Sequence, residues 1–372
     1  MKIAHIVSTF PPHLGGMGSV CWNEADLLSD RGHDVTVFTL EYPDTRYDDA
    51  IYPFSVVRLK AIFKYGDAGI VPQMLWRLNG FDIVHLHYPF YGGAEWLCFK
   101  KIPFVVTYHM DAQTTGMKSV FQKIYDLFWP GFIFSRAKKV IVVDSEYFKT
   151  VRFGKNVKPE NLVEIFNGVD TKLYKPMSAD LADLDLQDLD RKKIVLFVSN
   201  PIQLKRLDLL LQAMKIINDK DAMLVVVGGR YGLEKYKKIA KDLGIESRVK
   251  FMGASANSQQ VADYYNIATC FVLPSDYESF ALVVAEAMSS ALPVIGSDIP
   301  AIRNRIDDGV NGFLFKKGSA EDLAEKLGHL FSLSPEERKK MGENGRKKVI
   351  ENYSWTSHAD KLEAVYKDVI KK

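Results

Sequence analysis

Two glutamates stand eight residues apart in the segment Pro274 to Met288, directly after an apolar run typical of a buried strand. On a helix, with about 1.5 Å rise per residue, Glu278 and Glu286 would lie roughly 12 Å apart. The carboxyl pair of a glycoside hydrolase is closer, at about 5 to 9.5 Å. The spacing therefore suits contacts with the two ends of one extended ligand.

The backbone between these glutamates can hold a phosphate group. We expect Glu278 just before a helix and Glu286 two turns inside it. The N–H groups of Phe280, Ala281 and Leu282 then lie between them, at the positive end of the helix dipole. A diphosphate would fit there, with a sugar at one end and a ribose at the other. In the structural alternative, Glu278 caps the helix and Glu286 is a solvated helix residue.

A glycine-rich turn, Phe10 to Ser19, leads from the first apolar run into a helical pattern. Amides at such a helix start can meet a diphosphate, because glycine has no Cβ to obstruct them. An NAD-binding fingerprint is a second interpretation, since Glu41 ends the next strand where its acidic residue would stand. However, Cys21 occupies the position of the third glycine. We therefore expect no NAD site, and a turn without a ligand is the structural alternative.

Three histidines lie on or directly after predicted strands. His109 follows the strand pattern Phe104 to Tyr108, where a purely structural histidine is the alternative to a functional one. His85 and His87 project to the same side of another strand, a spacing that can hold a metal ion. No third ligand stands out in the sequence, so we expect no metal and no cofactor.

Short apolar, β-branched runs alternate with amphipathic helical patterns from one end of the chain to the other. Runs that are apolar throughout and separated by helices indicate parallel strands buried on both faces. They are too many for one sheet, so the fold class is α/β with two Rossmann-like, doubly wound domains. The runs include Lys2–Ser8, Asp34–Leu40, Phe81–Leu86, Phe104–Tyr108, Val140–Val143, Ile194–Ser199, Met223–Gly228, Val249–Met252, Thr269–Leu273 and Pro293–Ile295.

The domain boundary is expected after the turn-rich stretch Asn167 to Asp170. Beyond it lies the acidic segment Ser178 to Asp190, in which we expect little core. We assign residues 1–172 to an N-terminal acceptor domain and residues 173–355 to a C-terminal donor domain. The last helical pattern, about 356–372, is expected to pack back on the first domain.

Composition narrows the function classes. The chain has 372 residues, 47% of them hydrophobic, and 49 basic residues against 46 acidic ones give a formal net charge of +3. This balance gives no support to a nucleic-acid partner. No uncharged apolar run approaches the ~18 residues of a membrane span, and no signal-peptide pattern opens the chain. The chain has three cysteines and no CxxC pattern, which suggests buried free thiols in a reducing cytoplasm. They are Cys21, Cys98 and Cys270.

The segment Pro274 to Ser297 resembles the donor-site segment of family-four retaining glycosyltransferases. Other stretches resemble that family in the same order, so that the likeness covers nearly the whole chain. They are the glycine-rich turn, Arg31–Val37, Asp82–His87, Thr107–His109, Asn167–Asp170, Val249–Gly253 and Tyr353–Trp355. The resemblance implies the GT-B fold, in which two Rossmann-like domains face each other across a cleft that holds the active site.

The resemblance also implies roles for individual residues. Glu286 would bond the donor ribose, Glu278 the transferred sugar near its 3-hydroxyl, and His109 would face that sugar. Gly15 and Gly16 would hold the diphosphate. The amides that follow Glu278 would also hold it, and they belong to Ser279, Phe280, Ala281 and Leu282.

The family usually places an arginine and then a lysine after the first strand of the second domain, both aimed at the phosphates. Here Lys205 matches, but Asn200 stands where the arginine is expected. Ser199 and Asn200 are still candidates to bind the nucleotide donor. The adjacent Arg206 is our candidate to restore the charge. An uncompensated diphosphate would lose a contact of roughly 1.5 to 3 kcal/mol. Base recognition is expected from the backbone near two glycines, Gly228 and Gly253.

The segment Lys118 to Lys139 interleaves five basic residues and one acid, Asp126, with aromatic side chains. A basic helix with exposed aromatics would lie on an anionic membrane surface, with a lipid or lipid-linked acceptor. The alternative, a core helix with a few surface lysines, is the one we slightly prefer.

From these patterns we expect a cytoplasmic, metal-independent, retaining glycosyltransferase, which would be peripheral at the inner face of a membrane if residues 118–139 bind there. It would move a hexosyl unit from a nucleotide diphosphate sugar, UDP-linked rather than GDP-linked, to a hydroxyl of a sugar or lipid-linked saccharide. Family analogy favours front-face attack, with a covalent role for Glu278 as the weaker option. The alternatives are a nucleotide-sugar 2-epimerase-like enzyme of the same fold and a non-catalytic nucleotide-sugar-binding protein.

Overall fold

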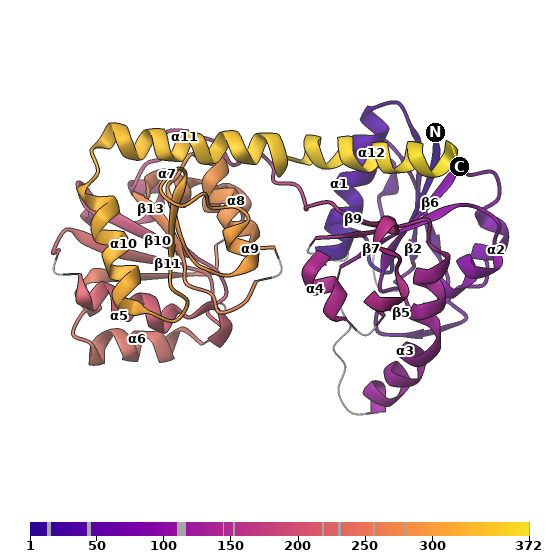
Figure 1. Cartoon of the computed structure of the whole chain (residues 1–372), viewed down its shortest axis with the longest axis horizontal. Coiled ribbons are helices and arrows are strands. Elements are labelled where there is room, and N and C mark those ends of the chain that lie inside the picture. The colour runs from indigo at the N-terminus through magenta and orange to yellow at the C-terminus, as the bar shows by residue number, and fades with distance from the viewer. Residues whose placement is uncertain are drawn as a thin grey trace. The chain divides into compact units, whose positions relative to one another are not determined.

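The computed structural model describes residues 1–371 except 13–15, 43–45, 110–116, 144, 152, 218, 230–231, 256 and 279. The chain forms two compact units (Figure 1). The first comprises Met1–Asn167 and Trp355–Lys372, and the second comprises Gly168–Ser354. The predicted boundaries, 172/173 and 355/356, lie within a few residues of these.

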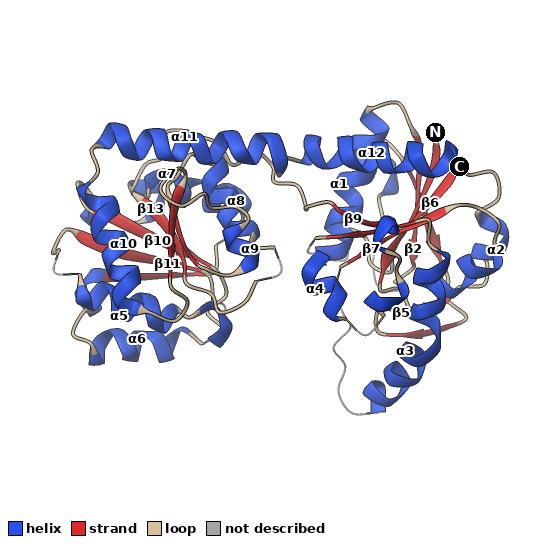
Figure 2. Ribbon diagram, in the orientation of Figure 1, coloured by secondary structure: helices blue, strands red, loops and turns tan. Residues whose placement is uncertain are grey.

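The first unit is built on a parallel sheet (Figure 2). Within the described residues it has seven strands in the order β3-β2-β1-β6-β7-β8-β9. Their bounds are β1 Lys2–Ile6, β2 Asp34–Leu40, β3 Ser55–Leu59, β6 Ile83–Tyr88, β7 Phe104–Tyr108, β8 Lys139–Val142 and β9 Leu162–Glu164. A separate antiparallel hairpin joins β4, Phe63–Tyr65, to β5, Ala68–Ile70.

Helices cover both faces of this sheet. They are α1 Gly16–Asp30, α2 Met74–Arg77, α3 Met117–Arg136, α4 Ser145–Thr150 and α12 Trp355–Lys371. Side chains alternate along each strand, so that Ile3 and Val7 of the first strand segment join one hydrophobic cluster while Ala4 and Ile6 join the other. The first of these clusters includes residues of α1 and α12, such as Leu28. The C-terminal helix therefore completes the core of the first unit.

The second unit has a parallel sheet with six strands among its described residues, in the order β12-β11-β10-β13-β14-β15. The strands are β10 Lys193–Val198, β11 Ala222–Val227, β12 Val249–Gly253, β13 Cys270–Leu273, β14 Val294–Ser297 and β15 Gly312–Phe315. The helices are α5 Leu207–Ile216, α6 Leu233–Asp242, α7 Ser258–Ile267, α8 Leu282–Ser289, α9 Pro300–Arg303, α10 Ala320–Ser332 and α11 Pro335–Asn352.

The strand order of each sheet determines where the loops with the predicted site residues lie. In each sheet the first strand lies between its sequence neighbour and a strand from much later, so β1 pairs with β2 and β6, and β10 pairs with β11 and β13. The loops that leave such strands diverge, which opens a crevice at the carboxyl edge of an α/β sheet. The loops after β1, β10 and β13 are the segments singled out from the sequence.

The predicted fold class is confirmed, and each of the ten apolar runs coincides with a strand. Five of the described strands lie outside the predicted runs: β3, β9 and β15 at sheet edges, and β4 and β5 of the hairpin. The expectation of little core after the boundary was wrong, since Leu184, Leu186 and Leu189 are buried. The three cysteines are buried and free, as predicted. Within the described ranges, no helix combines the length and apolar character that a membrane crossing requires.

Candidate functional site

The carboxyl ends of β10, β11 and β12 meet through backbone contacts. The Gly228 N–H donates to the Gly253 carbonyl at 2.6 Å. Gly228 has φ +117°, and a Cβ there would lie 2.2 Å from the Ser199 carbonyl oxygen. Only glycine fits this position, because a side chain would clash and the backbone conformation would be strained. Three residues predicted to contact the nucleotide are thus brought together, with exposed Asn200 following Ser199.

Lys205 and Glu278 form an ion pair between the loops that follow β10 and β13. Lys205 Nζ donates to Glu278 Oε1 at 2.6 Å, and buried Ser275 Oγ donates to the same oxygen at 2.7 Å. A backbone hydrogen bond from Asp276 to the Leu204 carbonyl ties the two loops together. The residues predicted to bind phosphate and sugar therefore lie in direct contact.

Arg206 is engaged by two carboxylates. Its Nη1 lies 3.1 Å from Asp276 Oδ2, and its Nη2 lies 3.1 Å from Asp208 Oδ2. Its backbone adopts a left-handed conformation with φ 49°, directly before α5. To restore the phosphate charge missing at Asn200, Arg206 would have to leave both acids. Lys205 is engaged by one carboxylate, that of Glu278, whereas Arg206 is engaged by two.

The helix that carries Glu286 is shorter than expected. It begins at Leu282, after Ala281 in a left-handed conformation with φ 52°. The prediction of two helical turns before Glu286 was wrong, because only about one turn of α8 precedes it, and Glu278 lies four residues before the helix. Phe280 and Ala281 are buried, Leu282 is exposed, and Ser279 lies outside the described residues.

Glu286 is not a solvated helix residue. The buried Tyr265 hydroxyl donates to its Oε2 at 3.0 Å. Burial raises the pKa of Glu286 to about 7, against the hydrogen bonds of Tyr265 and Tyr174, which lower it. Sequence reasoning missed both tyrosines, which lie on α7 and after the domain boundary, at no local spacing from Glu286.

In the first unit, Gly16 and His109 lie after β1 and β7, at the same edge of one sheet. A Cβ on Gly16 would meet nothing within 4 Å, whereas one on Gly18 would lie 2.6 Å from the Thr9 carbonyl oxygen. The structure thus leaves open space at Gly16 and uses Gly18 for packing. Gly15 lies outside the described residues.

His109 belongs to a chain of histidines. Its Nε2 lies 3.0 Å from His87 Nδ1, and His87 Nε2 lies 3.0 Å from His5 Nδ1. The expectation that His85 and His87 have no further potential ligand was wrong, because His5 and Glu24 lie beside them. Burial lowers the pKa of His109 to about 4, so this imidazole is neutral near pH 7.

Comparisons with known proteins agree with this architecture. The family model described as Glycosyltransferase Family 4 matches residues 14–173, and the model described as Glycosyl transferases group 1 matches residues 185–348. N-acetyl-alpha-D-glucosaminyl L-malate synthase of Bacillus anthracis is 26% identical over 375 residues, which cover 97% of this chain and 96% of the relative. MMP alpha-(1->4)-mannosyltransferase of Mycolicibacterium hassiacum is 26% identical over 100% of this chain and 98% of its own.

Solved structures match over the whole chain. A glycosyltransferase from Rickettsia africae superposes with a TM-score of 0.77 at 20% identity, covering 100% of this chain and 99% of its own. Anabaena HepE in complex with UDP also gives a TM-score of 0.77, at 17% identity, covering 99% and 100%. Two parallel-sheet units with this likeness show the GT-B fold. The chain belongs to family four of the glycosyltransferases, as its ordered motifs predicted.

Proposed function

We propose that the protein is a retaining hexosyltransferase that uses a nucleotide diphosphate sugar, UDP-linked rather than GDP-linked, and a saccharide or lipid-linked hydroxyl acceptor. The observation that carries this proposal is the contact of Lys205 with Glu278 in the same unit as Tyr265-bonded Glu286. It provides a cation for phosphate, a carboxylate for sugar and a carboxylate for ribose.

The donor would lie along the carboxyl edge of the second sheet. Glu286 would accept from the ribose hydroxyls, and the backbone near Gly228 and Gly253 would contact the base. HepE has been solved in complex with UDP and in complex with UDP-glucose, and the catalytic domain of starch synthase IV of Arabidopsis thaliana bound to ADP and acarbose. These complexes support a nucleotide donor, and the two HepE complexes support the choice of UDP.

The chemistry follows from the charges. As the bond between the sugar and the diphosphate breaks, negative charge grows on the leaving phosphate, where Lys205 and the first amides of α8 can stabilise it. The acceptor oxygen would bond to the same face of the sugar carbon, and its proton would pass to the leaving phosphate oxygen. Lys205 and Ser275 both bond Glu278 Oε1, so Oε2 is available to accept from a sugar hydroxyl. No metal is required for these steps.

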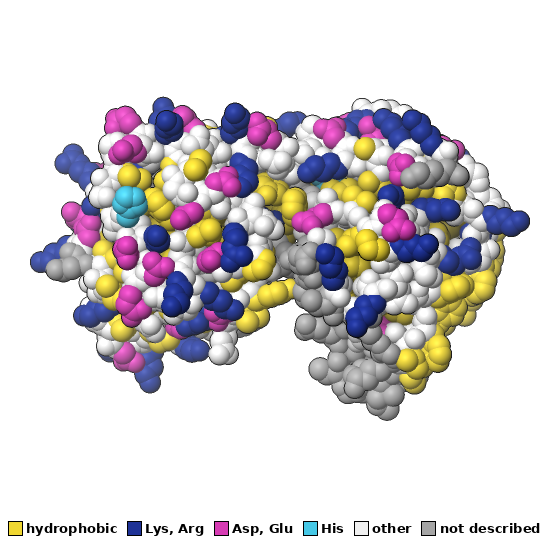
Figure 3. Space-filling model, in the orientation of Figure 1, with side chains coloured by type: hydrophobic (Ala, Val, Ile, Leu, Met, Phe, Trp, Pro, Cys, Tyr) yellow, Lys and Arg dark blue, Asp and Glu magenta, His cyan; other side chains and the backbone are white. Residues whose placement is uncertain are grey.

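The acceptor side would meet a membrane through α3. Four apolar side chains at helical spacing on α3 are 44 to 66% exposed, namely Ile124, Leu127, Phe128 and Phe132. Phe99 is 63% exposed and contacts Trp129. Hydrophobic side chains gather at the surface over this helix in Figure 3. The core-helix alternative is wrong for these four positions, and the exposed stripe supports an anionic membrane surface and a lipid-linked acceptor.

The test is thermal stabilisation of the whole chain by UDP, GDP, ADP and their sugars, with and without EDTA, followed by product analysis with the donor that binds. A ligand that binds only the native state raises the melting temperature by mass action. We expect a shift with one nucleotide class, unchanged by EDTA, and a glycoside whose anomeric configuration matches that of the donor. A shift with NAD alone would overturn the proposal, as would conversion of the donor to an epimerised nucleotide sugar. Donor binding without turnover would favour a non-catalytic protein.

A further inference from the structure

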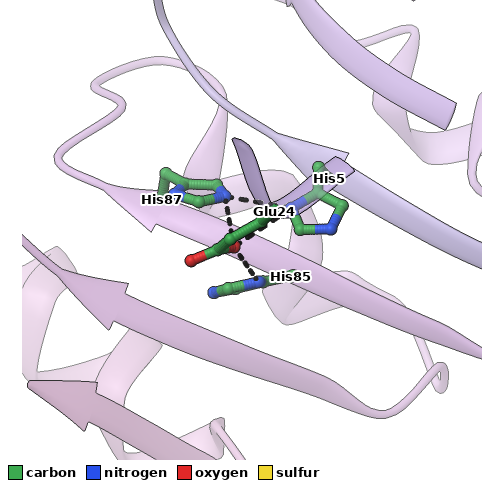
Figure 4. Close-up of side chains that lie close together, drawn as sticks. All are labelled: His5, Glu24, His85 and His87. Carbon is green, nitrogen blue, oxygen red and sulfur yellow. Dashed lines mark hydrogen bonds and ion pairs between the residues drawn. The ribbon is translucent and has the colours of Figure 1, made fainter. Parts of the chain in front are cut away.

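A buried cluster of ionisable side chains lies wholly inside the first unit (Figure 4). It comprises His5 on β1, Glu24 on α1, and His85 and His87 on β6, each 0 to 1% exposed. The register of the sheet creates it, because His5 pairs directly with His85 across β1 and β6. His87, two residues further along β6, points to the same face, which α1 covers.

The atoms of this cluster converge as metal ligands do. Glu24 Oε2 lies 3.7 Å from His5 Nδ1, 3.2 Å from His85 Nδ1 and 3.5 Å from His87 Nε2. His5 Nδ1 and His87 Nε2 are 3.0 Å apart. Ligand atoms around a tetrahedral zinc ion, at about 2.0 to 2.1 Å from the metal, are roughly 3.3 Å from one another. These four separations bracket that value, and all six lie within 4.8 Å.

The charges also suit a cation. By hydrogen-bond geometry, buried Glu24 Oε2 has no donor among the described residues. A metal ion would supply the positive partner that this oxygen lacks, and it would bind the imidazoles in their neutral form.

Three of the four side chains make a further polar contact through their other polar atom. Glu24 Oε1 lies 2.9 Å from His358 Nε2, and His85 Nε2 lies 2.7 Å from Thr107 Oγ1. His87 Nδ1 lies 3.0 Å from His109 Nε2. Such outer contacts orient metal-ligating histidines and carboxylates in known sites. With Nε2 of His87 on a metal, its Nδ1–H would donate to His109 and fix the ring of that residue.

We propose that His5, Glu24, His85 and His87 bind one divalent transition-metal ion, with zinc the best match to three imidazoles and a carboxylate. Four protein ligands close a tetrahedral site, which is the pattern of structural rather than catalytic zinc. The ion lies among the strands of the first unit and has no part in binding the donor phosphates. Because the ligands are buried, it enters as the unit folds.

One neighbour competes with the ion. The Tyr366 hydroxyl on α12 lies 2.6 Å from His85 Nδ1, the same nitrogen that faces Glu24. In a metal-free cluster this hydroxyl and His85 share a hydrogen bond, and metal binding replaces that hydrogen bond. Tyr366→Phe therefore separates the two states, since it removes a stabilising contact from a metal-free cluster but only a competitor from a metal site.

The test is metal analysis of the full chain, purified without a histidine tag after growth with added zinc. We expect about one zinc ion per chain after dialysis, loss of most of it in His5→Gln, and full retention in Tyr366→Phe. His33→Gln is the matched control, because His33 lies in the same unit but bonds Glu363 instead of Glu24.

A spectroscopic arm does not depend on the folding of any variant. Wild-type protein, unfolded with a chelator and refolded with Co²⁺, should show the visible absorption of tetrahedral cobalt. Wild-type protein with less than about a tenth of an equivalent of any transition metal, and without that absorption, would overturn the proposal. Neither experiment uses a nucleotide or a sugar. A negative result would therefore count against the metal site and not against the proposed transferase function.

Discussion

The two units share a parallel sheet but differ in where they place their charged side chains. In the second unit these groups stand on loops beyond the strands, and the side chains of Lys205 and Glu278 are 21% and 8% exposed. In the first unit His5, His85 and His87 lie within strands, and Glu24 is sealed beneath α12. The same kind of sheet therefore carries a charged pair on its loops in one unit and a closed charged cluster within its strands in the other.

The largest expected effect is a loss of turnover when Glu278 is replaced. It tests whether this residue contacts the transferred sugar rather than the nucleotide. Glu278→Ala should lower turnover by about a hundredfold, because the sugar loses a positioning contact, while UDP affinity changes little. Turnover and UDP binding of the purified variant measure both effects. Asp183→Ala, which removes an exposed acid of the same unit, is the control and should leave both unchanged. Unchanged turnover in Glu278→Ala would remove this residue from the sugar site.

The next prediction concerns the backbone of the candidate site in the second unit. Gly228→Ala should destabilise the second unit by roughly 3 kcal/mol, since the new Cβ meets a carbonyl and the backbone is strained. Gly232 also has a positive φ, of +88°, but a Cβ there meets nothing within 4 Å. Gly232→Ala should therefore cost only about 1 kcal/mol. Urea denaturation of the two variants compares them, and equal losses would contradict the close approach at Gly228.

The last prediction is a pH dependence, with a small effect at each pH step. The folded pKa of Glu286 is about 7, above the ordinary value of 4.5. The folded state therefore holds a proton that the unfolded state releases, and stability is lost as pH rises from 4.5 to 7. Relative to Glu286→Gln, the wild type should weaken by up to about 1.4 kcal/mol per pH unit in this range and no further above it. The measurement is the stability of both proteins across this pH range. Parallel profiles of stability against pH would refute the burial of Glu286.

The comparison also explains what the sequence could predict. The site of the second unit was foreseeable because Lys205, Glu278 and Glu286 belong to short segments at the ends of strands, where local spacing carries the information. Its details were not, because a left-handed Ala281 shortens α8 and Tyr265 reaches Glu286 from another helix. The fold itself followed from apolar runs that need no long-range knowledge.

Only half of the closed cluster of the first unit could be predicted from the sequence. His85 and His87 share a strand, so their spacing of two placed them together. His5 joins them only through the pairing of β1 with β6, and Glu24 through the packing of α1 on the sheet. Neither the strand pairing nor the helix packing can be predicted from the local sequence. On α3, likewise, the pattern showed aromatic residues but not which of them would be exposed.

The most direct test of the donor site is calorimetric titration of UDP into the wild type and into Glu286→Ala and Glu278→Ala. We predict that Glu286→Ala weakens UDP binding by roughly 1.5 to 3 kcal/mol, the contribution of a hydrogen-bonded charged group. Glu278→Ala should bind UDP nearly as the wild type does, because UDP lacks the hexosyl group that Glu278 would contact. Equal affinity in the wild type and Glu286→Ala would contradict the assignment of the ribose site.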